Sequence, residues 1–149
     1  MASLISTQEI ADYHQAINDH FDTFKRSITI HKEPIKKIIS SPSSFGPVIG
    51  YEDNAISEKI EYIPRSQSFE ALIDYDAGKG NIKDVVDLKV FMSANTVSIK
   101  VKKEARDYIL NDKTEKITFD NKSFNLLSQD VVKNYLGLIY YLFYLEETK

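Results

Sequence analysis

The sequence predicts a mainly β fold, a small β-barrel or sandwich with an N-terminal α-helix, and two observations support this. One helical stripe near the N-terminus is followed by several segments in which apolar and polar residues alternate with a period of two, as in half-buried strands. Turn-forming residues separate these segments at spacings typical of sandwiches and barrels. We therefore expect a single domain over residues 1–149, with the helix over about 7–25 and the β-barrel over about 26–146.

The predicted helix begins with a capping box. Ser6 is followed by Glu9, a spacing at which each side chain can bond to the backbone N–H of the other residue. Apolar residues then recur at steps of three and four: Ile10, Tyr13, Ile17, Phe21 and Phe24. This stripe predicts a helix that packs one face against the rest of the chain.

A β-forming stretch and a long loop follow the helix. Residues 27–39 are largely β-formers, and Pro34 marks a strand edge or a break because it cannot donate a hydrogen bond to a neighbouring strand. Residues 40–54, with the sequence SSPSSFGPVIGYEDN, contain two prolines and two glycines and predict a loop. A loop of this length in a compact domain is usually functional or disordered.

Further strands are predicted by alternation along the rest of the chain. The alternating segments are residues 69–75, 86–92, 97–101, 117–119 and 124–126, with a turn at 78–81 and a possible single helical turn at 105–110. Asp120 and Asn121 tolerate positive φ and suit a tight hairpin. We expect Phe119 and Phe124, which flank that turn, on the inward face of the hairpin.

The apolar run Tyr135–Leu145 is predicted to form a last strand that is covered on both sides. Alternation places Ile139, Tyr141 and Phe143 on one face and Tyr140, Leu142 and Tyr144 on the other. One core needs only the first face, so either the N-terminal helix or another subunit covers the second. Tyr140, Leu142 and Tyr144 are therefore the candidate subunit-interface residues.

Composition excludes several classes of function. Nineteen Lys and Arg against twenty-two Asp and Glu give a net charge of −3, and no third of the chain is basic, which argues against a dedicated nucleic-acid surface. The only basic cluster is Lys100, Lys102 and Lys103, a weak signal for contact with a phosphate backbone. The absence of cysteine excludes disulfides and thiol catalysis. The longest apolar run is about half a membrane-spanning helix, and no signal peptide is expected, which predicts a cytoplasmic origin.

No constellation of residues points to a reaction. His14 and His20 are too far apart around a helix to share a metal ion, and neither a nucleophile-elbow motif nor a glycine-rich phosphate loop is present. We therefore expect no catalytic residue, no metal site and no cofactor, and we predict that the protein is not an enzyme.

The order of elements resembles a family of viral proteins. The hairpin sequence KITFDNKSF (residues 116–124), the surrounding segment Asp112–Leu127 and the final run LGLIYYLFYL resemble the head-closure, or stopper, proteins in the neck of tailed bacteriophages. In that family, the chain folds as a small β-barrel and forms a ring beneath the portal and adaptor. The resemblance covers most of residues 25–145.

This resemblance implies a structural role. The chain is then expected to be a head-to-tail connector subunit of the virion neck that closes the DNA-filled head and docks the tail, after assembly in the host cytoplasm. The implied partners are other copies in a ring, the portal or adaptor, the tail-terminator proteins and, without sequence specificity, DNA in the channel; no membrane is involved. Loop residues are then the ones that reach into the channel or grip a neighbour: Phe45, Gly46, Pro47 and Tyr51. The alternative from the residues alone is a monomeric β-barrel that binds a ligand or a protein, with the aromatic strand lining its cavity.

Overall fold

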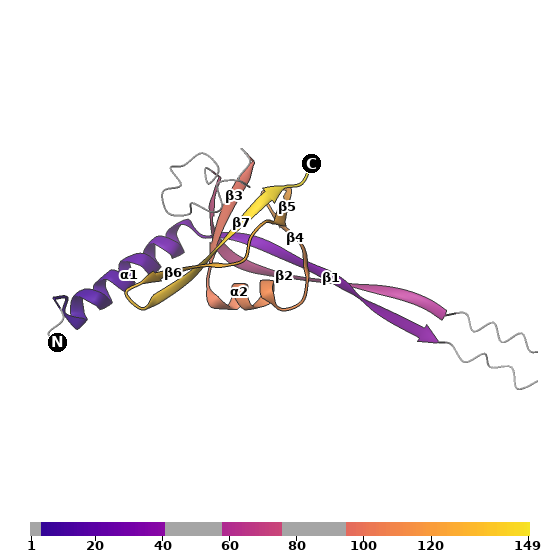
Figure 1. Ribbon diagram of the computed structural model, residues 1–149, viewed down its shortest axis with the longest axis horizontal. Coiled ribbons are helices and arrows are strands. Elements are labelled where there is room, and N and C mark those ends of the chain that lie inside the picture. Colours follow the sequence, from indigo (N-terminus) through magenta and orange to yellow (C-terminus); the bar gives the residue numbers. More distant parts are fainter. Residues whose placement is uncertain (1–3, 41–57, 76–94) are drawn as a thin grey trace, which may run out of the picture.

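The computed structural model describes residues 4–40, 58–75 and 95–149 and shows a mainly β protein with an N-terminal helix, which confirms the predicted fold class (Figure 1). Its elements are α1 (Thr7–Phe24), β1 (Arg26–Ser40), β2 (Glu58–Asp74), β3 (Thr96–Val101), α2 (Lys103–Leu110), β4 (Thr114–Phe119), β5 (Lys122–Leu126), β6 (Val131–Tyr135) and β7 (Leu138–Glu147). In the described part of the chain, no helix is long and apolar enough to cross a membrane.

The strands of the described residues form one antiparallel sheet that closes in a ring. Their order is β3-β2-β1-β4-β5-β7-β6, and a further pairing joins β3 to β7. Strand β3 pairs with one edge of β7, along residues 141–146 of β7. Two strands share the other edge of β7: β5 pairs at residues 145–147 and β6 pairs at residues 138–142. The ring therefore consists of six strands, and β6 extends beyond it as a hairpin with β7.

The core of the protein lies on the inner face of the ring. It includes Ile28, Ile30, Val97, Ile99, Val101, Ile117, Phe124, Phe143 and Leu145. Phe119 and Phe124 stack with their ring centroids 4.1 Å apart, and Phe124 is fully buried. Asp120 (φ 51°) and Asn121 (φ 59°) both adopt the left-handed conformation that a tight hairpin needs. The predicted inward position of the two phenylalanines is confirmed.

Helix α1 begins with the predicted capping box, in which Ser6 and Glu9 bond to each other's backbone N–H. It packs on the β6–β7 hairpin through Phe21, whose ring centroid lies 5.2 Å from that of Tyr140. His14 Nε2 lies within hydrogen-bond distance of the carbonyl oxygens of Tyr135 (2.9 Å) and Leu136 (3.0 Å). The helix is thus attached to the sheet along one face.

Two predictions of element boundaries were wrong. The run Tyr135–Leu145 is not one strand, because Leu136 (φ 53°) and Gly137 (φ 101°) form a turn and Tyr135 belongs to β6. Residues 103–110 form an eight-residue helix rather than a single turn. Pro34 does not end its strand; instead, the register of β1 against β2 shifts between Lys32 and Ile35.

The predicted turn at 78–81 and strand at 86–92 lie outside the described residues, as does nearly all of the predicted loop.

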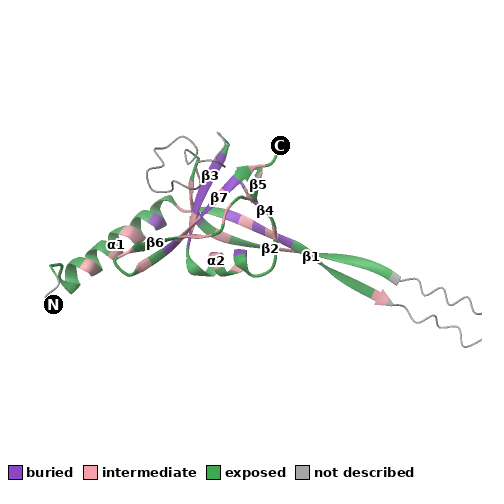
Figure 2. Cartoon of the chain, in the orientation of Figure 1, coloured by how far each residue is buried: buried purple, intermediate pink, exposed green. Residues whose placement is uncertain are grey.

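The molecule is elongated, and this shape decides where its surfaces can act. Helix α1 and the β6–β7 hairpin lie at one end, the closed sheet and α2 lie in the middle, and the outer halves of β1 and β2 extend to the other end (Figure 1). The buried residues concentrate in the middle, and the outer parts of β1 and β2 are exposed (Figure 2).

Candidate functional site

The most distinctive surface is a two-stranded ribbon that leaves the body of the protein. Strand β4 pairs with β1 no further than Lys32, and β3 pairs with β2 no further than Ala71. The outermost parts of β1 and β2 pair only with each other among the described strands and project away from the sheet (Figure 1). We call residues 35–40 and 58–63 the arm.

One face of the arm is mostly apolar. Lys36 lies opposite Tyr62, and Ile38 lies opposite Ile60, so these four side chains share a face. Tyr62 is 62% exposed, Ile38 55% and Ile60 42%. We call this the Tyr62 face; the register places Ser40 and Glu58 on it as well, at the outer end, so it carries one lysine and one glutamate.

The opposite face of the arm also carries exposed apolar side chains. Ile35 lies opposite Ile63, and Lys37 lies opposite Glu61. Both isoleucines are more than 40% exposed. We call this the Ile35 face. A two-stranded ribbon has no interior of its own and is marginally stable alone, so apolar residues on both faces indicate a surface that a partner covers.

At the root of the arm, the sequence disfavours the pairing of another strand with the edge of the ribbon. The register shift in β1 places Glu33 and Pro34 opposite Pro64 of β2. Proline has no backbone N–H to offer another strand, and natural edge strands use proline, lysine and bulges to prevent uncontrolled pairing. The sequence therefore favours binding through the faces of the arm over extension of the sheet at this point.

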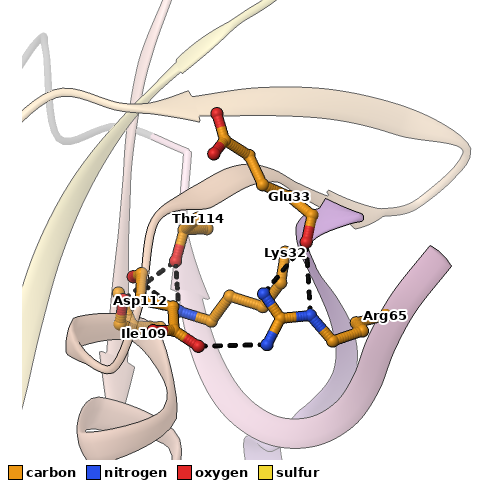
Figure 3. A network of polar contacts seen from close by, with 6 residues as sticks. All are labelled: Lys32, Glu33, Arg65, Ile109, Asp112 and Thr114. Atoms are coloured by element: carbon orange, nitrogen blue, oxygen red, sulfur yellow. Dashed lines mark hydrogen bonds and ion pairs between the residues drawn. The ribbon is translucent and has the colours of Figure 1, made fainter. Parts of the chain in front are cut away.

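A buried lysine anchors the root of the arm. Lys32 is 3% exposed, and its Nζ donates hydrogen bonds to the carbonyl oxygens of Ile109 (2.9 Å) and Asp112 (3.1 Å) and to Thr114 Oγ1 (2.9 Å) (Figure 3). These three bonds use all the donors of the ammonium group. The Nζ also lies 5.1 Å from the ring centroid of Tyr108, a cation–π distance.

Burial lowers the pKa of the Lys32 ammonium, because removal from water disfavours its charge. The carboxylate of Asp112 opposes this change, and the guanidinium of Arg65 adds to it. The neutral oxygens that accept from Nζ stabilise the charged form, as a buried cation requires. The site is therefore a structural anchor that joins β1 to the segment between α2 and β4.

Arg65 strengthens the same anchor from the second strand of the arm. Its Nε and Nη2 donate to the carbonyl oxygen of Glu33 at 3.2 and 3.0 Å, and its Nη1 donates to Asp112 Oδ2 at 3.0 Å (Figure 3). The backbone N–H of Glu33 donates to the carbonyl oxygen of Lys113 at 3.2 Å. Together, these contacts fix the direction in which the arm leaves the body.

Lys32→Met should lower the free energy of unfolding by about 1–3 kcal/mol, because the part-buried carbonyl of Asp112 loses its hydrogen-bond donor and the buried carbonyl of Ile109 loses one of its two donors, while the apolar stem is kept. Urea denaturation would measure the change. Lys37→Met, the same substitution on the exposed arm, serves as the control and should change stability by less than about 0.5 kcal/mol. Equal effects of the two substitutions would contradict the anchor.

The structure places the predicted site residues in different settings. Phe45, Gly46, Pro47 and Tyr51 lie outside the described residues, in the segment that connects the two strands of the arm in sequence. Leu142 and Tyr144 are half-buried on the outer face of β7 and stay predicted interface residues.

Tyr140 has a partner within the chain. It is 1% exposed, and its hydroxyl donates to Asn18 Oδ1 of α1 at 2.7 Å. Burial raises the pKa of the Tyr140 phenol. Of the two coverings that the sequence left open, the N-terminal helix covers this residue, so Tyr140 is not available to another subunit.

The basic cluster is also engaged within the chain. Lys100 Nζ donates to the hydroxyl of Tyr135 at 2.9 Å, Lys102 Nζ lies 4.8 Å from the centroid of the Phe21 ring, and Lys103 pairs with Asp107 at 3.3 Å. Lys100 and Lys102 contact neighbouring elements and Lys103 pairs within α2, so these lysines add little to the case for contact with DNA.

Half of the arm was not predicted from the sequence, because no strand was assigned to residues 58–68. A signal was available: Lys59 and Glu61 alternate with Ile60 and Tyr62. The arm offers exposed apolar side chains, charged lysines and one tyrosine hydroxyl. Groups of these kinds recognise the surface of another molecule. Among the residues with described positions, no group of three or more His, Asp and Glu side chains could hold a metal ion.

Comparisons with known proteins do not assign the chain to a family. No family model matches it, and neither the curated proteins nor the solved structures gave a match.

Proposed function

We propose that this protein is a non-catalytic structural subunit that assembles with copies of itself, of the head-closure type found in the neck of tailed phages. The observation that carries the proposal is the arm, which exposes apolar side chains on both faces outside the core. A subunit in an assembly can bury this surface against its neighbour, whereas a monomer leaves it in water.

The phage setting rests on the family resemblance of the sequence. In that setting the subunits form a ring in the virion neck, in contact with the portal or adaptor above and the tail-terminator protein below, around a channel that contains DNA. The segment that joins the two strands of the arm includes Phe45, Gly46, Pro47 and Tyr51. In our proposal it reaches into the channel or grips a neighbouring subunit.

A second candidate is the monomeric binding module. The inside of the described ring is filled by Phe119, Phe124 and Phe143, which leaves no support there for a ligand lined by the aromatic strand. A hollow of about 450 Å³ does lie between β2 and α2, and it would be the place for such a ligand. It is lined by Gln67, Phe69, Glu104, Asp107, Tyr108 and Asn111.

Mixing with a portal–adaptor complex from the same genome tests the proposed function. The wild-type chain should co-sediment with the complex, and negative-stain images should show an added ring of density. A chain that remains monomeric alone, or one that does not bind the complex, would overturn the proposal. A small molecule that strongly raises the melting temperature of that monomer would instead favour the binding module.

A further inference from the structure

We propose that the arms of two copies pack face to face through their Tyr62 faces, in opposite directions, around a two-fold axis. The inference rests on the part of the proposed function that gives the arm another copy of this chain as its partner. A two-fold contact is complete with two copies. The inference therefore concerns the free chain, and the pair has to separate before its subunits join a ring.

The Tyr62 face has the layout that an interface between two copies requires. Ordered from the root of the arm to its outer end, its cross-strand pairs are Lys36 with Tyr62, Ile38 with Ile60, and Ser40 with Glu58. The middle pair is apolar, and its two side chains are 55% and 42% exposed. One lysine and one glutamate lie on either side of this pair, so the face has an apolar centre, charged ends and no net charge.

The charges on this face select the direction of packing. Lys36 lies at the root of the arm and Glu58 at its outer end. When the second arm runs in the opposite direction, its outer end meets the root of the first arm, so each lysine lies near the glutamate of the other copy. When both arms run in the same direction, the two lysines meet at one end and the two glutamates at the other. Electrostatic complementarity therefore favours opposite directions.

The Ile35 face does not have the same symmetry. Ordered in the same way, its cross-strand pairs are Ile35 with Ile63, Lys37 with Glu61, and Ile39 with Lys59. A two-fold axis perpendicular to the strands would pass through the charged middle pair and place Lys37 of one copy against Lys37 of the other. The two lysines and one glutamate also leave a net positive charge on this face in each copy. A second copy therefore fits the Tyr62 face better than the Ile35 face.

Pairing supplies the interior that a single ribbon lacks. A two-stranded ribbon is marginally stable alone, whereas two ribbons packed face to face form a small four-stranded sandwich. The axis passes through the middle pair, so Ile38 faces Ile38 of the other copy and Ile60 faces Ile60. Because the arm projects from one end of the elongated molecule, arms that run in opposite directions place the two bodies at opposite ends of the pair (Figure 1).

Charge exchange tests the contacts at the two ends. Lys36→Glu and Glu58→Lys should each weaken self-association about tenfold, because each places like charges together at both ends of the pair. The chain that carries both substitutions should return to within about threefold of the wild type, because complementarity is restored with the signs exchanged. Lys37→Glu, on the Ile35 face, is the matched control and should change affinity less than about threefold. Sedimentation velocity measures association, and circular dichroism checks that each variant is folded.

Crosslinking at single cysteines tests the two-fold axis, since the natural chain contains no cysteine. Packed sheets lie about 10 Å apart, which is too far for a disulfide, so a short bismaleimide is used. The Ile38→Cys chain should crosslink with itself, because this residue lies at the axis. Ile35→Cys is the matched control, since it changes the same residue type at a position that is 48% exposed on the other face. It should give at least about fivefold less crosslinked dimer, because the thickness of the ribbon separates the two faces.

A third cysteine tests the direction of packing. In the proposed pair, the two copies of residue 62 lie four residues apart along the strands, which adds about 13 Å to the gap between the sheets. Tyr62→Cys should therefore crosslink poorly. If it crosslinks as well as Ile38→Cys, the arms run in the same direction and the inference is wrong.

The remaining outcomes separate this inference from the proposed function. If Ile38→Cys crosslinks no better than Ile35→Cys, or if the charge-exchanged chain does not recover, the arm-to-arm pair is wrong, while a wild-type chain that associates and binds the portal–adaptor complex keeps the proposed function. If the pair crosslinks as expected but the chain does not bind that complex, this inference stands and the proposed function fails. A wild-type chain that never associates overturns both.

Discussion

Phe124→Ala should lower the free energy of unfolding by about 3–5 kcal/mol, the usual cost of truncating a fully buried phenylalanine. The side chain lies on the inner face of the ring, opposite Ile117 in the β4–β5 hairpin, and stacks on Phe119 with an interplanar angle of 6°. Its removal leaves a cavity where β4, β5 and β7 meet, and the tight Asp120–Asn121 turn limits how far the backbone can close it.

Phe24→Ala is the matched control for this prediction, because it removes the same side chain from a position that is 60% exposed. It should cost less than about 1 kcal/mol. Chemical denaturation of both variants would measure the difference. A cost below about 1 kcal/mol for Phe124→Ala would mean that the core is not where the structure places it.

The double substitution Ile38→Asp with Ile60→Asp should abolish self-association while the fold remains intact. The two side chains lie opposite each other on the Tyr62 face and are 55% and 42% exposed, so the monomer loses little when they change. In an interface, two unpaired carboxylates would be buried at a cost of several kcal/mol, which corresponds to more than about a hundredfold in affinity.

Aspartate substitutions at two exposed leucines outside the arm separate an effect of the arm from a general effect of added charge. Leu110 is 45% exposed and Leu127 is 40% exposed, and both lie outside the arm and α1. The Leu110→Asp, Leu127→Asp chain should associate like the wild type in light scattering. Equal loss of association in both double variants would indicate net charge, not the arm, as the cause.

Local signals in the sequence predicted local structure well. The Ser6–Glu9 capping box defined the start of α1, and the periodic apolar residues defined its length to within a residue of the observed end at Phe24. Asp120 and Asn121 predicted the tight hairpin, because few residues other than glycine tolerate positive φ at two successive positions. In these cases the interactions that decide the structure lie within a few residues along the chain.

The arm could not be predicted in the same way. Ile28 and Ile38 belong to the same strand and the same residue type, yet Ile28 is fully buried and Ile38 is 55% exposed. The difference arises because β4 pairs beside Ile28 and ends before Ile38, which is a contact between residues far apart in sequence. Periodicity shows which residues share a face, but it does not show whether another element covers that face.

Lys32 and Gly137 show two other limits of prediction from the sequence. Ile28, Ile30 and Lys32 follow the same period, so the lysine falls on the inner face, and only the α2–β4 segment makes that position tolerable for a cation. Gly137 lies near the start of the apolar run Tyr135–Leu145. Alternation alone predicted that this run is one strand, although it contains the turn at Gly137. A glycine inside an apparent strand often marks a turn or bulge, and here that signal outweighed the apolar pattern.

The mass of the wild-type chain in solution tests the central claim most directly. Sedimentation equilibrium over a wide range of concentration should show mass rising from the 17.1 kDa monomer toward a multiple of it, whereas the Ile38→Asp, Ile60→Asp chain should remain at 17.1 kDa. A wild-type chain that stays at 17.1 kDa at every concentration would contradict the account.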